Sequence, residues 1–143
     1  MKIAIGCDSA GFIFKTELIK DLIELGYEVV DCGPEEDSQV DYPIYAKKVS
    51  KLVSENEVPY GILICGTGIG MSIVANKFKG VRAALVTSVF QAQATKEHND
   101  SNILCLGARV TELEDAKKFM KVWLDTPFSG IDRHIRRIKQ IEE

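Results

Sequence analysis

Short runs of apolar residues alternate along the chain with longer segments in which apolar residues recur at helical spacing. The apolar runs are typical of buried β-strands and lie at Lys2–Cys7, Tyr27–Asp31, Tyr60–Cys65, Arg82–Val86 and Asn102–Leu106. The segments between and after them predict helices over about 12–25, around 45–53, from 69, up to about 98, from 111 and near the C-terminus. Because nearly continuous apolar strands are covered on both faces, this alternation predicts a parallel sheet between two layers of helices.

Individual helices also show which side they bury. The first helix should end near Gly26, and its predicted inward face comprises Phe14, Leu18, Leu22 and Leu25, with Ile19 and Ile23 beside them. Thr111-Glu-Leu-Glu114 has the form of a capping box, which predicts the start of a helix with Leu113, Ala116, Met120 and Trp123 inward. A last helix carries Ile131, Ile135, Ile138 and Ile141 on one side. We therefore expect a three-layer, Rossmann-like α/β fold with a five-stranded parallel sheet and a C-terminal amphipathic helix.

Composition narrows the class of protein. The 143 residues fit one domain over 1–143, with 45% hydrophobic and 27% charged residues and a net charge of -3. This charge gives no reason to expect a nucleic-acid or membrane partner. The N-terminus turns polar too soon for a signal peptide, and no apolar run approaches membrane-spanning length. Cysteines at 7, 32, 65 and 105 are too widely spaced to indicate disulfides or a zinc site, so we expect free thiols and a cytoplasmic location.

In sheets of this kind, ligands bind beyond the carboxyl ends of the strands. Four segments with residue types common in active sites lie next to predicted strands: 7–11, 65–72, 97–100 and 107–109. They contain a cysteine, an aspartate, a histidine, an arginine and a glycine-rich turn. We expect all of them to lie at the same edge of the sheet.

The most informative segment is Cys65-Gly-Thr-Gly-Ile-Gly70, which leads from a strand into a helix. Alternate glycines let the chain turn tightly and direct successive N–H groups inward, where they can hold a phosphate or a developing oxyanion. A plain strand-to-helix turn is the alternative. The dinucleotide pattern would need glycine at Met71, and no Gly-Lys-Ser/Thr follows, so neither a dinucleotide site nor a P-loop is indicated.

Cys65 stands directly before this loop. A thiol at a helix N-terminus is in surroundings that favour the thiolate, whereas most free cysteines are simply buried apolar residues. Cys105 lies in mid-strand and should be core, and Cys7 ends a strand without a comparable glycine loop. A phosphatase would need arginine six positions after Cys65, where Met71 stands.

Other polar residues allow two interpretations each. His98 near the end of a helix complements the helix dipole or serves a site, and Asp8 is a helix cap or a ligand contact. The last helix carries Arg133, Arg136, Arg137 and Lys139 opposite its isoleucines, which suits a solvated face or a phosphate.

Taken together, these motifs resemble the ribose-5-phosphate isomerase B family of sugar-phosphate isomerases, which includes the galactose-6-phosphate isomerase subunits. The resemblance runs through the whole chain. It rests on the order and spacing of 6–11 (Gly-Cys-Asp-Ser-Ala-Gly), 41–43 (Asp-Tyr-Pro), 64–70, 75–77 (Ala-Asn-Lys), 81–83 (Val-Arg-Ala), 97–100, 106–109 and Arg133-His134 with Arg137.

The resemblance implies an aldose–ketose isomerase of the pentose phosphate pathway that interconverts ribose 5-phosphate and ribulose 5-phosphate through a cis-enediol, with no metal and no cofactor. It implies Cys65 as the base, His98 as the group that opens the sugar ring, and Thr67 at the enediolate oxygen. Further substrate contacts would come from Asp8, Ser9, Tyr42, Gly66, Gly68, Ile69, Gly70, Ser72 and Asn99, and phosphate contacts from Arg109, Arg133 and Arg137. The family also implies a homodimer, or a tetramer, whose active site is shared between chains.

Two segments depart from the family pattern. The family usually has Asp-His where this chain has Asp8-Ser9, near the phosphate end of the substrate, and Gly130-Ile-Asp-Arg-His134 replaces Gly-Gly-Arg-His. Isomerisation of another small sugar phosphate, of the tetrose, allose or galactose type, is therefore the alternative substrate assignment. A flavodoxin-like module that binds a phosphate-bearing ligand without turnover is the alternative of a different class.

Overall fold

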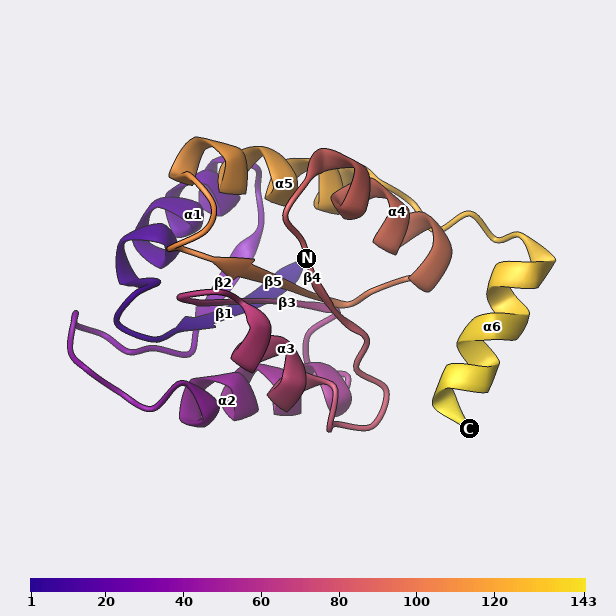
Figure 1. Ribbon diagram of the computed structural model, residues 1–143, viewed down its shortest axis with the longest axis horizontal. Coiled ribbons are helices and arrows are strands. Elements are labelled where there is room, and N and C mark those ends of the chain that lie inside the picture. The colour runs from indigo at the N-terminus through magenta and orange to yellow at the C-terminus, as the bar shows by residue number, and fades with distance from the viewer.

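The computed structural model describes residues 1–143 and has five parallel strands and six helices (Figure 1). The strands are β1 (Lys2–Cys7), β2 (Glu28–Asp31), β3 (Tyr60–Cys65), β4 (Ala83–Leu85) and β5 (Ile103–Gly107). The helices are α1 (Phe12–Glu24), α2 (Tyr42–Ser54), α3 (Ile69–Ala75), α4 (Val89–Asn99), α5 (Leu113–Asp125) and α6 (Asp132–Glu142). The strand order is β2-β1-β3-β5-β4, which confirms the predicted five-stranded parallel sheet.

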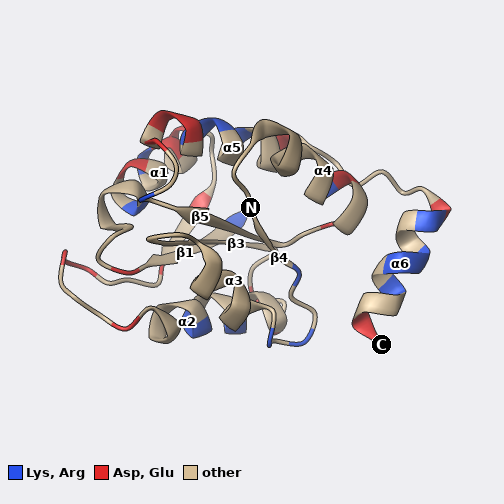
Figure 2. Cartoon of the chain, viewed as in Figure 1, with Lys and Arg blue, Asp and Glu red and all other residues tan.

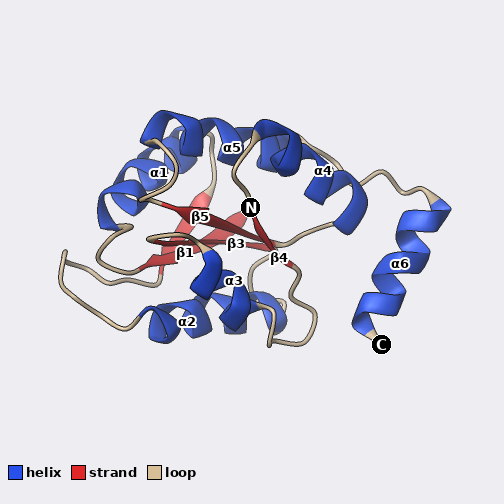
Figure 3. Ribbon diagram, viewed as in Figure 1, coloured by secondary structure: helices blue, strands red, loops and turns tan.

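Two layers of helices cover the sheet (Figure 3). Helices α1, α4 and α5 lie on one face, where Leu18, Ala92 and Trp123 belong to one apolar core. Helices α2 and α3 lie on the other face, where Val49 and Met71 belong to a second core. The central strands β1, β3 and β5 are buried almost throughout because both faces are covered.

Two details of the helix predictions are wrong. Leu25 and Ile23 are 47% and 60% exposed, and Lys15 is buried instead because its ammonium group bonds to Asp31 and to a loop carbonyl. Thr111 does not form a capping box: its amide bonds to Gly107 O in the turn after β5, and α5 begins at Leu113 with no side-chain cap. Gly26, with φ +94°, does end the first helix as predicted.

The last helix stands apart from the three layers (Figure 1). Its basic residues are conspicuous in Figure 2, and His134 is its one buried residue. Ile131, directly before the helix, and Ile141 within it are 42% and 58% exposed. The apolar side of α6 is thus largely uncovered in the single chain. None of the helices combines the length and the apolar character that crossing a membrane requires.

Candidate active site

The Cys65 loop turns the chain sharply from β3 into α3. Cys65 is 5% exposed, and its Sγ accepts a hydrogen bond from the Gly68 amide at 3.1 Å. Gly68 has φ +79°, and a Cβ built on it would lie 2.6 Å from Leu85 Cδ1 and 3.0 Å from the carbonyl carbon of Leu106. Only glycine fits this backbone and this space. The glycine therefore permits the turn that brings an N–H group onto the sulfur.

The first turn of α3 presents further N–H groups beside the thiol. The Ile69 amide bonds to Thr67 Oγ1 at 3.2 Å, whereas the amides of Gly70 and Met71 have no acceptor within the chain. Ser72 Oγ donates to Ile69 O at 2.7 Å, which closes the turn. Free N–H groups at a helix start carry partial positive charge. The loop can therefore stabilise negative charge on an oxygen placed near Cys65.

Two other predicted residues lie against this loop. A Cβ built on Gly66 would be 3.3 Å from Arg109 Cδ and Nη1, so the guanidinium group lies over the loop backbone. A Cβ built on Gly70 would be 2.6 Å from Tyr42 Cε1 and 3.0 Å from its hydroxyl oxygen. Both glycines leave room for these side chains. The structure thus brings Tyr42 and Arg109 to the Cys65 loop.

The turn after β1 lies next to the end of β3, beside the Cys65 loop. The Asp8 amide bonds to Ile64 O at 3.1 Å, next to Cys65 in the adjoining strand. Asp8 Oδ1 accepts from the Gly11 amide at 3.1 Å and so holds the turn ahead of α1. Ser9 and Asp8 are both half-buried at this position. The local role of Asp8 leaves its second carboxylate oxygen available for a ligand.

The other three thiols differ from Cys65 in their surroundings. Burial raises the pKa of Cys7 to about 12, with a smaller opposing effect from the Lys15 ammonium group. Burial also raises the pKa values of Cys32 and Cys105. Cys105 is fully buried in mid-strand, as the sequence predicts. These three residues are neutral thiols near pH 7.

A second group of predicted residues gathers where α4 ends against α6. His98, Asn99, Arg133 and Arg137 line a cavity of about 350 Å³ together with His134, Ile138 and Ile141. The rings of His98 and His134 are 4.6 Å apart between centroids, and His134 Nδ1 lies 2.6 Å from Ser129 Oγ. An imidazole and two guanidinium groups around one cavity form a positively charged site that suits a phosphorylated ligand.

The expectation that all these groups share one edge of the sheet is wrong. A helix that follows a parallel strand runs back across the sheet, so the end of α4 lies at the amino edge, where Asn102 O accepts from the Gly61 amide. Cys65 ends the same strand that Gly61 belongs to, at the carboxyl edge. The steps from Tyr60 to Cys65 alone span about 16 Å. One chain therefore holds the predicted site as two separate halves, the Cys65 half and the His98 half.

His134 is not among the site residues predicted from the sequence. It lies in the quoted Arg133-His134 pair, and its being one of only two histidines is the signal that could have singled it out. Burial of the ring lowers the pKa of His134, and the electrostatic effects of His98, Arg133 and Arg137 lower it further. His134 is thus held neutral beside the cationic groups of its own cavity.

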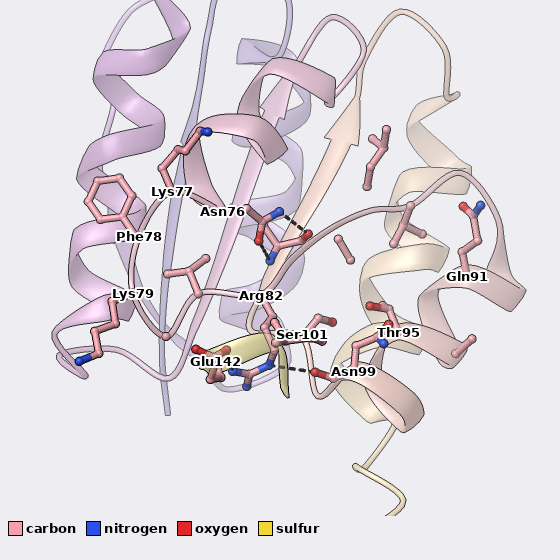
Figure 4. Close-up of a pocket in the computed structure, with 18 of the residues that line it drawn as sticks. Asn76, Lys77, Phe78, Lys79, Arg82, Gln91, Thr95, Asn99, Ser101 and Glu142 are labelled. Atoms are coloured by element: carbon pink, nitrogen blue, oxygen red, sulfur yellow. Dashed lines mark hydrogen bonds and ion pairs between the residues drawn. The ribbon is translucent and has the colours of Figure 1, made fainter. Parts of the chain in front are cut away.

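Another cavity, of about 850 Å³, runs along the edge strand β4 and the helix α4 (Figure 4). Asn76 pairs with both backbone groups of Ala83 there, at 3.0 Å and 2.8 Å, and so covers part of the free sheet edge. Of the predicted site residues only Asn99 lines this cavity. Nowhere does the chain bring together three or more His, Cys, Asp or Glu side chains that could hold a metal ion.

Comparison with known proteins assigns the family. The Ribose/Galactose Isomerase family matches residues 3–141. The chain belongs to this family. Ribose-5-phosphate isomerase B of Escherichia coli is 47% identical over 140 residues, which cover 98% of this chain and 93% of the relative.

Solved structures of the family agree with this fold. The ribose-5-phosphate isomerase B of Clostridium thermocellum is similar with a TM-score of 0.96 and 45% identity, covering 99% of this chain and 95% of that one. The Mycoplasma genitalium enzyme, solved with bound ribulose-5-phosphate, has a TM-score of 0.94 and 39% identity, covering 99% of this chain and 93% of that one. The agreement extends over nearly the whole chain, so both halves of the predicted site lie within the family fold.

Proposed function

We propose that this protein interconverts ribose 5-phosphate and ribulose 5-phosphate, with Cys65 as the base. The observation that carries the proposal is the Gly68 amide bonded to Cys65 Sγ beside the free amides of Gly70 and Met71. Family membership, the name of the Escherichia coli relative and the ribulose-5-phosphate complex of the Mycoplasma genitalium enzyme support this substrate pair. The reaction is a step of the pentose phosphate pathway.

The chemistry requires a base next to a stabilised oxygen. Cys65 as thiolate takes the proton from C2 of the open-chain aldose, the electron pair forms the C1–C2 double bond, and O1 takes the negative charge. The free amides of the α3 turn and Thr67 stabilise that oxygen, with Gly66, Gly68, Ile69 and Ser72 shaping the turn. The proton of the O2 hydroxyl passes to O1, Cys65 returns its proton to C1, and O2 becomes the carbonyl, which completes the ketose. No metal and no cofactor takes part in these steps.

The two halves of the site require a second chain. His98, Asn99, Arg133 and Arg137 lie at the opposite edge of the sheet from Cys65, so we infer a homodimer in which the His98 half of one protomer faces the Cys65 half of its partner. Exposed apolar residues support a partner at both places: Ile69 and Ile73 near Cys65 are 50% and 57% exposed, and α6 leaves its isoleucines uncovered. In this arrangement His98 opens the furanose ring, and Arg109, Arg133 and Arg137 hold the phosphate.

A mixing experiment tests the shared site. Cys65→Ala and His98→Asn are each expected to be inactive, and the two variants are unfolded together and refolded as an equal mixture. Because every mixed dimer keeps one site with both groups intact, the mixture should recover about a quarter of wild-type activity. A mixture as inactive as its components, with mixed dimers shown by mass spectrometry, would contradict the shared site.

The identity of the sugar depends on Ser9, because the family usually places a histidine there. Asp8, Tyr42 and Asn99 contact the sugar hydroxyls, and the short Ser9 side chain leaves more space at the phosphate end. Another small sugar phosphate, of the tetrose, allose or galactose type, is the second candidate. Assays with four-, five- and six-carbon sugar phosphates decide between them: the highest kcat/KM on ribose 5-phosphate supports the first, and a clear preference for a non-pentose overturns it.

We also infer that the protein works in the cytoplasm. All four cysteines are free, and a reducing compartment keeps them so. Formation of a disulfide in the protein isolated from cells with its thiols blocked at lysis would contradict this location.

A further inference from the structure

Arg82 joins the two elements that carry the His98 half of the site. Its Nε donates to Asn99 O at 2.9 Å and to Asp100 O at 3.2 Å, and its Nη2 donates to Asp100 O at 2.9 Å. Its Nη1 donates to Glu142 Oε1 of α6 at 2.7 Å. Figure 4 shows the guanidinium group between the end of α4 and Glu142. One side chain thus binds the carboxyl ends of both helices.

The turn that Arg82 binds is strained. Asp100 ends α4 with φ 44° and ψ 49°, a left-handed backbone that residues other than glycine seldom adopt. The amides of Asp100 and Ser101 bond back to Lys96 O and Thr95 O, which closes the helix end. The carbonyls of Asn99 and Asp100 then point away from the helix toward the guanidinium group. Arg82 supplies the donors that these carbonyls need in this conformation.

The backbone of Arg82 is itself fixed. Its amide bonds to Asn102 Oδ1 at 2.8 Å, and the Asn102 amide returns a bond to Arg82 O at 3.0 Å. Asn102 Nδ2 also donates to Gly80 O at 2.8 Å. The side chain of Arg82 is only 17% exposed. Both the backbone and the side chain of Arg82, directly before β4, are therefore held in place.

Arg82 also helps to attach α6 to the rest of the chain. Near its start, α6 meets α4 through the His98–His134 ring contact and through the Ser129 amide, which bonds to Glu97 O at 3.3 Å. At its other end the ion pair of Glu142 with Arg82 holds it. Arg133 and Arg137 lie between these two attachments. Their distance from His98 and Asn99 therefore depends on both.

We propose that Arg82 is a positioning residue for the isomerase: it holds the strained turn that orients His98 and Asn99, and it fixes α6 at a set distance from them. The inference rests on the proposed function only for its kinetic consequence. The structural part, that Arg82 maintains the left-handed turn at Asp100, holds for any ligand of this cavity.

The test combines removal of the guanidinium group with relief of the strain. Arg82→Met is expected to lower kcat/KM for ribose 5-phosphate about 10- to 100-fold, because a displacement of the order of 1 Å has effects of this size. Asp100→Gly makes the turn without strain. The double variant Arg82→Met/Asp100→Gly should therefore regain most of the lost kcat, although the lost Glu142 contact leaves KM raised.

Controls separate positioning from general stability. Lys79→Met removes an exposed cation from the same loop and should keep wild-type kinetics. Glu142→Gln should raise KM and leave kcat nearly unchanged. Amide hydrogen exchange at Asp100 and Ser101 should become faster in Arg82→Met and slow again in the double variant; for this readout Arg82→Lys, which keeps the charge but not the planar fork, replaces Arg82→Met if the latter does not fold.

The outcomes are distinct. Wild-type kinetics in Arg82→Met, or a loss of kcat that Asp100→Gly does not restore, would overturn the proposal. An inactive wild-type protein would overturn the proposed function instead, and the exchange rates at Asp100 and Ser101 would then decide the structural part alone.

Discussion

The backbone amide of Gly68 donates a hydrogen bond to the sulfur of Cys65 over 3.1 Å. This contact exists because Gly68 adopts φ +79° at the start of α3, in a space where Leu85 and Leu106 leave no room for a side chain. The same turn leaves the amides of Gly70 and Met71 without an acceptor in the chain. The Cys65 sulfur and the free N–H groups beside it thus come from one short stretch of backbone.

The turn at Gly68 should be sensitive to substitution. Gly68→Ala should lower the free energy of unfolding by about 1–2 kcal/mol for the left-handed backbone and by about 1–3 kcal/mol more for the overlap with Leu85 and Leu106. Gly80 is the matched control, because it has φ +78° with nothing within 4 Å of an added Cβ. Gly80→Ala should show only the first loss. Equal losses in urea unfolding would contradict the space restriction.

Loss of His98 should affect sugars that form a furanose ring more than sugars that cannot. His98→Asn should lower kcat/KM for ribose 5-phosphate by about 10²- to 10⁴-fold, the range for loss of a general acid–base group. A four-carbon aldose phosphate with its phosphate on O4 cannot close a furanose ring, so the relative loss with it should be much smaller. Steady-state assays of both sugars measure the two ratios. Equal losses would show that His98 does not act in ring opening.

His134 should make the stability of the protein depend on pH under acidic conditions. Burial lowers its pKa in the folded protein from the ordinary 6.5. The electrostatic effects of His98, Arg133 and Arg137 lower it further, and the Glu97 carboxylate opposes them. The unfolded chain therefore takes up a proton at a higher pH than the folded one. Stability should fall as the pH drops below 6.5 and stay level above it. Urea unfolding between pH 5 and 8 should show this slope, and His134→Gln should remove it; an unchanged slope would assign it to other groups.

The absence of a metal from the proposed steps can be tested directly. The amides of the α3 turn stabilise the enediolate oxygen in this mechanism, so prolonged dialysis against a chelator should leave kcat and KM unchanged. Metal analysis by mass spectrometry of the dialysed protein is the control. Activity that is lost on dialysis and returns with a divalent cation would contradict the mechanism.

The sequence predicted most of the fold because apolar runs and helical spacing report burial directly. β1 and β3 have the predicted bounds, and the parallel sheet with helices on both faces is confirmed. Local patterns were weaker at the ends of helices. Leu25 follows the helical spacing of its face but is exposed, and the bond of Thr111 to Gly107 O replaces the predicted capping box.

The sequence named candidate site residues, but it did not predict how they are arranged. The glycine loop and Cys65 are contiguous, so the sequence alone places them together. His98 follows β4 along the chain, but α4 runs back across the sheet and carries it to the amino edge. The contacts of Arg82 with Asn99 and Glu142 join residues 17 and 60 positions away, and no local pattern reports them.

In the proposed mechanism Cys65 moves the proton between C1 and C2. Its most direct test is the rate at which ribose 5-phosphate gains solvent deuterium and becomes ribulose 5-phosphate, measured by NMR for the wild type, Cys65→Ala and Cys65→Ser. Both variants should keep the wild-type fold and oligomeric state and lose about 10²- to 10⁴-fold in both rates, because alanine has no base to offer and a serine alkoxide forms far less readily than a cysteine thiolate. Substantial deuterium exchange and turnover in Cys65→Ala would contradict the role of Cys65 as the base.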